Sequence, residues 1–273
     1  MRIVRGRPLH RTLLRSRLLI TTELKDRIAF IKLARPATRN ALAIDDWVAL
    51  KTAIEGINST SARVIVLAST LDATFCAGSD LKAMEVLVGQ PELVVEFRLR
   101  MREAIEAVAA ASIPTMANIQ GDCFGAGVAL ALACDIRVAG GRARFGVTPA
   151  KLGISYPVED IARLVKAVGS GQASRLLMVA DTISAADAHR TGLVQMLGEV
   201  AEAERVATAI ANNAPQSVAT MKRVIQATMQ GNKLASDEIF DGFFASEAFA
   251  EGLNAFKDKR PPIYADEPRS VEK

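Results

Sequence analysis

Short β-branched runs alternate with segments of helical periodicity along most of the chain. The runs LLITTEL and RIAFIKLA flank Lys25 and Asp26 and predict a β-hairpin, while RVIVLAS, IPTMANI and DIRVAG predict buried strands. Apolar residues at positions 44, 47, 50, 54 and 57 predict a helix in IDDWVALKTAIEGI, and a second helical stretch extends from Pro91 to Ala111. Strands that alternate with helices in this way predict ββα units joined by crossover connections.

After Gly169 the pattern is helical almost throughout. The segment PQSVATMKRVIQATMQG begins at Pro215 and ends at Gly231, as helices commonly do. No linker separates this part from the rest, so we expect the C-terminal third to pack on the remainder of the chain or on a partner subunit. The longest apolar run, from Val128 to Cys134, is far too short to span a bilayer.

The composition indicates one large domain, or one domain with an appendage, because half of the 273 residues are apolar. The three cysteines show no paired spacing, which argues against a disulfide framework and favours a reducing compartment, so a cytoplasmic location is expected. His10 and His189 are far apart in the sequence. We therefore expect neither a histidine-based metal site nor a Ser-His-Asp triad.

The net charge of +4 comes from the N-terminal arm rather than from the body. Six arginines precede Glu23, the first acid, and their +6 leaves about −2 for the remainder. Residues 1–17 could contact nucleic acid or a membrane surface, act as a transit peptide, or be a solvated extension. We favour the solvated extension, or a start codon placed too early, because six arginines without aromatic residues are weak evidence for a binding face.

Two segments place glycines in a loop between a strand and a helix: FCAGSDLKAM and GDCFGAGVAL. The N-terminus of a helix leaves backbone N–H groups unpaired and carries partial positive charge. Two such termini aimed at one point can stabilise a carbonyl oxygen that becomes an enolate or a tetrahedral oxyanion. A single glycine loop of this kind more often reflects tight packing than a binding site. Only the two loops together therefore indicate an oxyanion hole.

With three further motifs, the chain from about residue 18 to residue 264 resembles the enoyl-CoA hydratase/isomerase (crotonase) family. RPATRNAL is similar to a turn of that family, the two glycine loops to its oxyanion segments, FGVTPAKLGISYP to the following strand and loop, and SEAFAEGLNAFKDKRPPIY to its closing helix. The resemblance implies an α/β fold, a crotonase-like spiral of ββα units with a C-terminal helical region that trimerises. The expected division is a basic extension (1–17), the spiral core (18–205), the helical region (206–264) and a polar tail (265–273).

The resemblance also implies a substrate and its binding residues. The substrate would be an acyl-CoA thioester, with coenzyme A as part of the substrate, no permanently bound cofactor and no metal. The backbone N–H groups of Ser79 and Ala126 would form the oxyanion hole, with Ala126 replacing the usual glycine. The backbone that would hold coenzyme A belongs to Ala41, Ala77, Asp80, Leu81 and Lys82. Lys257 or Lys259 would reach a neighbour's phosphates in a homotrimer or dimer of trimers, or be a solvated lysine.

Hydratases of this family carry two glutamates, and the corresponding positions here are Ala129 and Pro149. Neither residue can transfer a proton, so hydration by the usual route is not expected. Tyr156 could assist a decarboxylation, as a tyrosine does in the methylmalonyl-CoA decarboxylase branch, although that branch has a histidine at the position of Ser79. Alternatively, Tyr156 is a packing residue whose hydroxyl forms a hydrogen bond within the protein.

An acid near this loop could also carry protons. Glu159 and Asp160 are candidates, and their alternative role is to open the helix EDIARLVKAV. Asp122 is a third candidate, or a residue that stabilises a turn. Cys76 and Cys123 flank the two loops, but neither has a base nearby in sequence.

The sequence therefore predicts an acyl-CoA enzyme that stabilises a thioester enolate, with decarboxylase- or isomerase-type chemistry both open. Two alternatives remain: a catalytically silent acyl-CoA-binding protein, and an RNA-binding member of the family that would use the basic arm.

Overall fold

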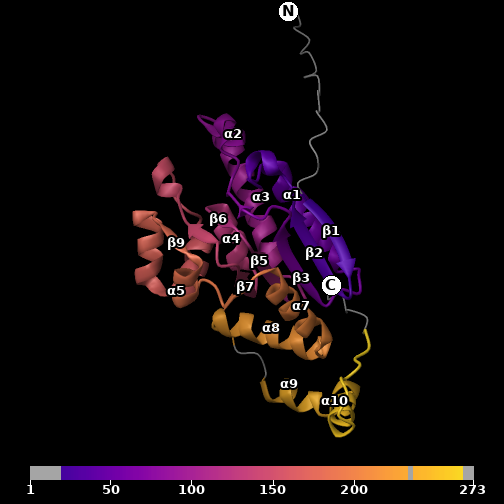
Figure 1. Ribbon diagram of the computed structural model, residues 1–273. Coiled ribbons are helices and arrows are strands. Elements are labelled where there is room, and N and C mark those ends of the chain that lie inside the picture. The colour runs from indigo at the N-terminus through magenta and orange to yellow at the C-terminus, as the bar shows by residue number, and fades with distance from the viewer. Residues whose placement is uncertain (1–19, 233–235, 267–273) are drawn as a thin grey trace, which may run out of the picture.

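The computed structural model describes residues 20–232 and 236–266 (Figure 1). The basic arm, residues 1–17, lies outside the described residues. Within them, no helix is long and apolar enough to cross a bilayer. Among these described residues, no group of three or more His, Cys, Asp or Glu side chains could hold a metal ion.

The larger of two sheets has six strands in the order β1-β2-β3-β5-β7-β10. β1 and β2 form the predicted hairpin, in which Asp26 and Arg27 adopt positive φ, and the remaining neighbours are parallel. The strands are β1 (Ile20–Lys25), β2 (Ile28–Leu33), β3 (Val64–Ser69), β5 (Thr115–Ile119), β7 (Ile136–Ala139) and β10 (Met196–Leu197).

The smaller sheet has four strands in the order β4-β6-β8-β9. They are β4 (Thr74–Cys76), β6 (Asp122–Phe124), β8 (Arg144–Gly146) and β9 (Thr182–Ser184). Each of β3, β5 and β7 is followed by a strand of the smaller sheet and then by a helix. The chain therefore repeats a ββα unit, as the alternating sequence pattern predicts.

The helices of these units pack on one face of the larger sheet. They are α1 (Ile44–Ile57), α3 (Pro91–Ala109), α4 (Ala126–Ala133) and α5 (Val158–Ser174). The single turn α2 (Leu81–Met84) follows the first glycine loop and buries none of its residues. The 3-10 turns η1 (Pro36–Thr38), η2 (Glu85–Leu87) and η3 (Pro149–Leu152) lie in the connecting loops. Every residue of α4 is buried, because its sequence AGVALALA contains no polar side chain. α4 therefore forms the centre of the core beneath both glycine loops.

The opposite face of the larger sheet is covered by α7 (Val200–Asn212). Side chains alternate along a strand, so Ile65 and Leu67 pack into the main core while Val64 and Val66 pack beneath α7. β3 is consequently buried on both faces, which explains its uninterrupted apolar sequence.

The C-terminal third is helical almost throughout, as predicted, apart from two short strands that the sequence pattern did not indicate. β9 and β10 are strands of three and two residues that pair with β8 and β7. Such short pieces carry no periodicity, and only their tertiary partners make them strands. Besides α7 and the end of α5, its helices are the π-turn η4 (Arg175–Val179), α6 (Ala185–Arg190), α8 (Pro215–Met229), α9 (Ser236–Phe243) and α10 (Glu247–Lys257).

α9 and α10 lie at the opposite end of the molecule from α2 (Figure 1). The segment after α10 returns to the body through Arg63, whose side chain is 4% exposed. Its guanidinium donates to the Asp266 carboxylate, to the Tyr264 carbonyl and to the Ala211 carbonyl. This buried cation holds the end of the described chain against the core.

Candidate active site

The first glycine loop connects β4 to α2 and is held by the turn that follows η1. The Leu42 N–H donates to the Gly78 carbonyl at 2.8 Å, and the Asp80 N–H donates to the Leu42 carbonyl at 3.0 Å. These two bonds flank Ser79 and make it the parallel bridge partner of Leu42. The N–H of Ser79 itself therefore points away from Leu42.

Asn40 fixes the turn that carries Leu42. It adopts φ +58 and is fully buried, and its amide donates to the Ser69 hydroxyl and to the Phe75 carbonyl. Its side-chain oxygen accepts from the Arg35 N–H at 2.8 Å. A single buried amide thus ties the turn to the strands on which the first loop is built.

The second loop connects β6 to α4. The Gly125 N–H donates to the Gly146 carbonyl at 2.9 Å, and Gly125 has φ +50, a conformation that favours glycine. A Cβ at Gly127 would lie 2.7 Å from the Cys76 carbonyl oxygen. Glycine at 127 therefore lets the first turn of α4 pack directly on β4.

The two loops meet at Gly78. A Cβ placed there would lie 3.0 Å from the Phe124 carbonyl oxygen and 3.4 Å from the Ala126 nitrogen. Within the described residues, no hydrogen-bond acceptor is recorded for the N–H of Ser79 or of Ala126. The fold therefore brings two backbone donors without protein acceptors to neighbouring points, the requirement for binding an oxyanion.

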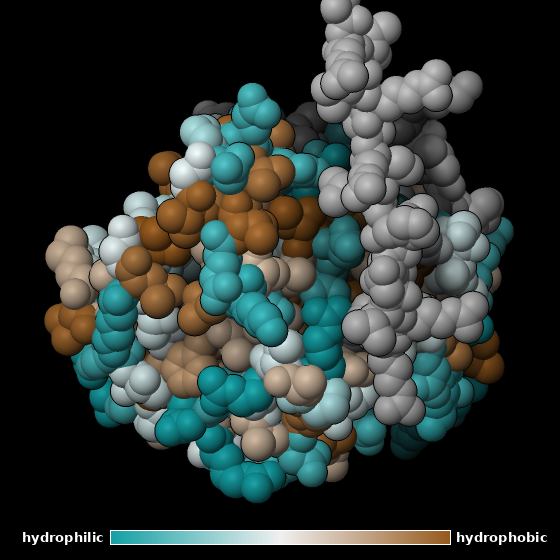
Figure 2. Space-filling model, turned by 90° about the horizontal axis from the view of Figure 1, so that it is seen from above, coloured by the Kyte–Doolittle hydropathy of each residue, from teal (hydrophilic) through white to brown (hydrophobic). Residues whose placement is uncertain are grey.

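The residues predicted to hold coenzyme A surround the first loop. Ala41 lies in the turn beside Leu42, and the Ala77 N–H donates to the Arg39 carbonyl. The Asp80 side chain caps α2 by accepting from the N–H groups of Lys82 and Ala83. Leu81 and Lys82 are exposed. Figure 2 shows apolar side chains gathered on the face that carries α2, and the exposed apolar residues of this region are Leu81, Val86, Val88, Leu93 and Val94.

Tyr156 is buried, and its hydroxyl donates to the Gly125 carbonyl at 2.9 Å. Burial raises the pKa of this phenol well above its usual value, the charge of Asp160 raises it further, and the Ala129 N–H acts in the opposite direction. The phenol therefore stays protonated, and its proton is used to hold the residue that precedes Ala126. Of the two roles open from the sequence, this geometry favours the structural one.

Glu159 and Asp160 both lie in the first turn of α5, yet their surroundings differ. The Glu159 side chain is 39% exposed and pairs with Arg102 at 2.8 Å. The Asp160 side chain is 4% exposed and pairs with Arg163 at 3.1 Å. Burial raises the pKa of Asp160 to about 6, and Arg163 limits that rise.

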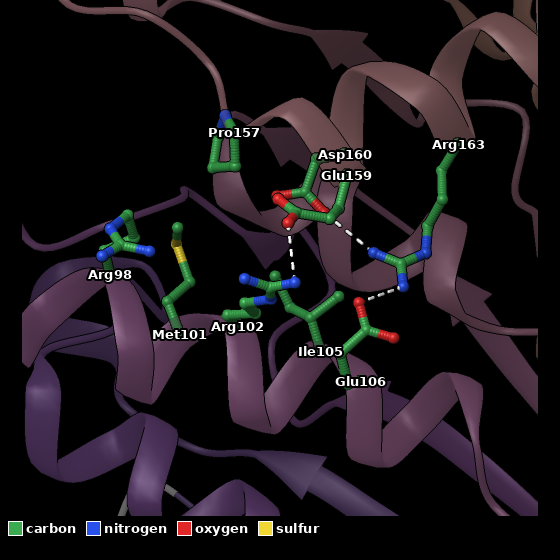
Figure 3. A pocket seen from close by; sticks show the side chains of 9 residues that line it. All are labelled: Arg98, Met101, Arg102, Ile105, Glu106, Pro157, Glu159, Asp160 and Arg163. Carbon is green, nitrogen blue, oxygen red and sulfur yellow. Dashed lines mark hydrogen bonds and ion pairs between the residues drawn. The ribbon is translucent and has the colours of Figure 1, made fainter.

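These two acids line a small, open pocket between α3 and α5 (Figure 3). Its α3 wall consists of Arg98, Met101, Arg102, Ile105 and Glu106, which the sequence reasoning did not single out. Their spacing places them on one face of α3, but the sequence does not show that α5 lies opposite that face.

The remaining candidates have structural partners. The Asp122 carboxylate accepts two bonds from the Arg144 guanidinium at 2.7 and 2.8 Å. Burial raises the pKa of Cys76 to about 12 and that of Cys123 well above its usual value. Both thiols therefore stay protonated and are poor nucleophiles.

Neither position implied for a hydratase glutamate carries an acid. Ala129 is 0% exposed in α4, and Pro149 opens η3. Lys257 and Lys259 are exposed at the end of α10, which is remote from α2 in the same chain (Figure 1).

The sequence model of the enoyl-CoA hydratase/isomerase family matches residues 23–267. The chain belongs to the enoyl-CoA hydratase/isomerase family. The family resemblance and the crotonase-like α/β fold expected from the motifs are thus confirmed, and the chain is a member of a family of enzymes that process acyl-CoA thioesters.

Relatives and solved structures of the enoyl-CoA hydratase/isomerase family agree over most of their length. The chain is 31% identical to the probable enoyl-CoA hydratase 2, mitochondrial, of Arabidopsis thaliana, over 86% of this chain and 80% of that one. It is 29% identical to the crotonyl-CoA hydratase of Syntrophomonas wolfei, with 88% and 95% covered. The crystal structure of a family protein from Hyphomonas neptunium superposes with a TM-score of 0.85 at 35% identity, covering 92% and 98%. The enoyl-CoA hydratase of Bacillus anthracis gives a TM-score of 0.85 at 30% identity, covering 91% and 100%.

Proposed function

We propose that the chain stabilises the enolate of an acyl-CoA thioester between the backbone N–H groups of Ser79 and Ala126. The observation that carries this proposal is the meeting of the two loops at Gly78, with both N–H groups lacking an acceptor in the described chain. As negative charge develops on the thioester oxygen, two aligned donors stabilise it without reorganising. Coenzyme A would lie along Ala41, Ala77 and the segment from Asp80 to Lys82.

Among the chemistries open from the sequence, the side chains favour isomerase-type proton transfer. Asp160 is the best proton carrier, because its pKa of about 6 lets it accept and release a proton near neutral pH. Glu159 and Asp160 each pair with an arginine, but Glu159 is far more exposed, so it is the weaker candidate. Tyr156 uses its proton on Gly125, which gives less support to a decarboxylase-type role.

Hydration is not expected, because Ala129 and Pro149 offer no carboxylate to position and activate water. Because these two positions carry no carboxylate, one alternative is a protein that binds acyl-CoA without turning it over.

The direct test incubates the protein in deuterium oxide with enoyl-, malonyl-type and β-oxo-acyl-CoAs and follows the products by mass spectrometry. Enolate formation is expected to introduce deuterium next to the thioester carbonyl and to shift or remove an acyl group in at least one substrate. Binding of acyl-CoA without exchange or turnover anywhere in the panel would support the silent binder instead.

We also propose that the chain forms a homotrimer or a dimer of trimers through α9 and α10. Phe240, Phe244 and Phe249 form an edge-to-face cluster and are 65%, 56% and 44% exposed. Exposed apolar clusters of this kind mark interaction surfaces. Light scattering of the purified protein is expected to give the mass of three or six chains, and a monomeric mass would contradict the proposal.

A further inference from the structure

Tyr156 contacts the peptide that contains one of the two proposed oxyanion donors. Its hydroxyl donates to the Gly125 carbonyl at 2.9 Å, and the N–H of that same peptide belongs to Ala126. The peptide is trans, so it is planar and its C=O and N–H bonds point in opposite directions. The direction of the Gly125 carbonyl therefore determines the direction in which the Ala126 N–H points.

The other hydrogen bonds to the Gly125 carbonyl come from α4 itself. The Val128 N–H donates to this carbonyl at 2.9 Å and the Ala129 N–H at 3.4 Å. Both groups belong to the helix that Ala126 begins, so they move with that helix and do not tie it to its surroundings. Tyr156 belongs to the segment before α5, which packs on α4. Its hydroxyl thus anchors the peptide from outside the helix.

Gly125 gives this peptide a conformational freedom that an outside contact can limit. The Gly125 N–H is held by the Gly146 carbonyl at 2.9 Å, but that bond fixes the preceding peptide, between Phe124 and Gly125. Glycine has no side chain to restrict the rotation between its two peptides, and Gly125 adopts φ +50 and ψ −120. The Tyr156 hydroxyl holds the peptide on the far side of that rotation.

The hydrogen bond from Tyr156 also bears on the strength of the Ala126 donor. A bond accepted by a peptide carbonyl polarises the peptide and strengthens the bond that its N–H donates. Tyr156 is 7% exposed, so its bond lies in a region of low dielectric, where such polarisation is strongest. Burial also raises the pKa of the phenol well above its usual value, which keeps the hydroxyl a donor.

We infer that Tyr156 is a positioning residue of the oxyanion hole, which orients and polarises the Ala126 N–H through the carbonyl of Gly125. This inference rests on the proposed function, because it requires that the Ala126 N–H binds the thioester oxygen. A tyrosine that only fills space beside α4 would not change the polarity of the hole when the donor strength of its hydroxyl changes.

The experiment measures the infrared stretching frequency of the thioester carbonyl of isotope-labelled acetyl-CoA, free in water and bound to the protein. Donors that polarise the carbonyl lower this frequency, because they draw electrons from its double bond. Tyr156→Phe removes the hydroxyl and little volume. Tyr264 is the chain's other tyrosine and lies after α10, so Tyr264→Phe is the matched control.

A second arm changes the donor strength of Tyr156 while keeping the side chain. In the Tyr264→Phe background Tyr156 is the remaining tyrosine. Biosynthetic replacement of tyrosine by the more acidic fluorotyrosine then strengthens the hydrogen bond to Gly125 with little change of shape. This arm does not depend on whether Tyr156→Phe folds.

The unmodified protein and Tyr264→Phe are expected to lower the carbonyl frequency equally on binding. Tyr156→Phe is expected to lose up to about half of this shift, because Ser79 still donates, and fluorotyrosine is expected to enlarge it. The inference is overturned if Tyr156→Phe keeps the full shift, or if fluorotyrosine leaves the shift unchanged. If acetyl-CoA does not bind to the unmodified protein, or binds with no shift, the proposed function itself fails, which is a different result.

Discussion

The convergence of the two loops can be tested by adding a single methyl group at Gly78. Gly78 has φ +102, and its added Cβ would lie 3.0 Å from the Phe124 oxygen and 3.4 Å from the Ala126 nitrogen. Both are backbone atoms, which cannot rotate aside as a side chain can. Gly78→Ala should therefore push the loops apart by a few tenths of an ångström and misalign the N–H groups of Ser79 and Ala126.

The cost of this substitution has two parts. A non-glycine residue in such a conformation costs on the order of 1–3 kcal/mol of stability. Loss of a working oxyanion donor costs roughly 10²–10³-fold in turnover. For binding, two hydrogen bonds to the thioester oxygen at about 0.5–1.5 kcal/mol each correspond to roughly 5- to 150-fold in affinity.

The contribution of the oxyanion hole to affinity is measured by calorimetry with acetyl-CoA and its thioether analogue, which lacks the carbonyl oxygen. The unmodified protein is expected to prefer the thioester, and Gly78→Ala to lose that preference. Gly89→Ala is the control, because Gly89 has φ +72 and a Cβ there would meet nothing within 4 Å. It should lose comparable stability in thermal unfolding while keeping the preference. A Gly78→Ala protein that still distinguishes the two ligands would refute the assignment of the hole.

Three further predictions concern protons, hydration and the C-terminal segment. Because burial raises the pKa of Asp160 from 3.8 to about 6, its ionisation destabilises the folded state as pH rises through this range. In urea unfolding, the free energy of unfolding of Asp160→Asn should rise by about 2 kcal/mol relative to that of the unmodified protein between pH 4.5 and 7.5. If the difference between the two proteins is the same at both pH values, the raised pKa of Asp160 is contradicted. Crotonyl-CoA hydration should be slower than in a two-glutamate hydratase by roughly 10²–10⁴-fold per missing group in a spectrophotometric assay, and an ordinary enzymatic rate would show that another acid does this work. Arg63→Met should release the segment after α10, seen as faster proteolysis near Tyr264, and unchanged proteolysis would mean that other contacts hold it.

The fold and the two loops could be predicted from the sequence because their signals are local. The β-branched run VIVLAS forms a strand that is buried on both faces. The segment AGVALALA forms a fully buried helix, because it has no polar side chain that needs solvent. Gly78 and Gly125 have backbone angles that favour glycine, so the residue type itself marks the loop.

The role of Tyr156 could not be predicted in the same way. Its hydroxyl bonds to a carbonyl 31 residues earlier in the chain, and nothing in LGISYP indicates which acceptor it meets. The sequence left two roles open, and the hydrogen bond to the Gly125 carbonyl favours the structural one.

Glu159 and Asp160 show most clearly what a sequence leaves out. As neighbouring acids at a helix start they are equivalent in pattern, and both fit the rule that acids precede a helix. On a helix, however, consecutive residues point about 100° apart. That rotation leaves the Glu159 side chain 39% exposed beside Arg102 and buries the Asp160 side chain to 4%. This burial raises the pKa of Asp160 to about 6. The rotation that separates the two acids is fixed by the packing of α5 on the core, through Leu164 and Ala173.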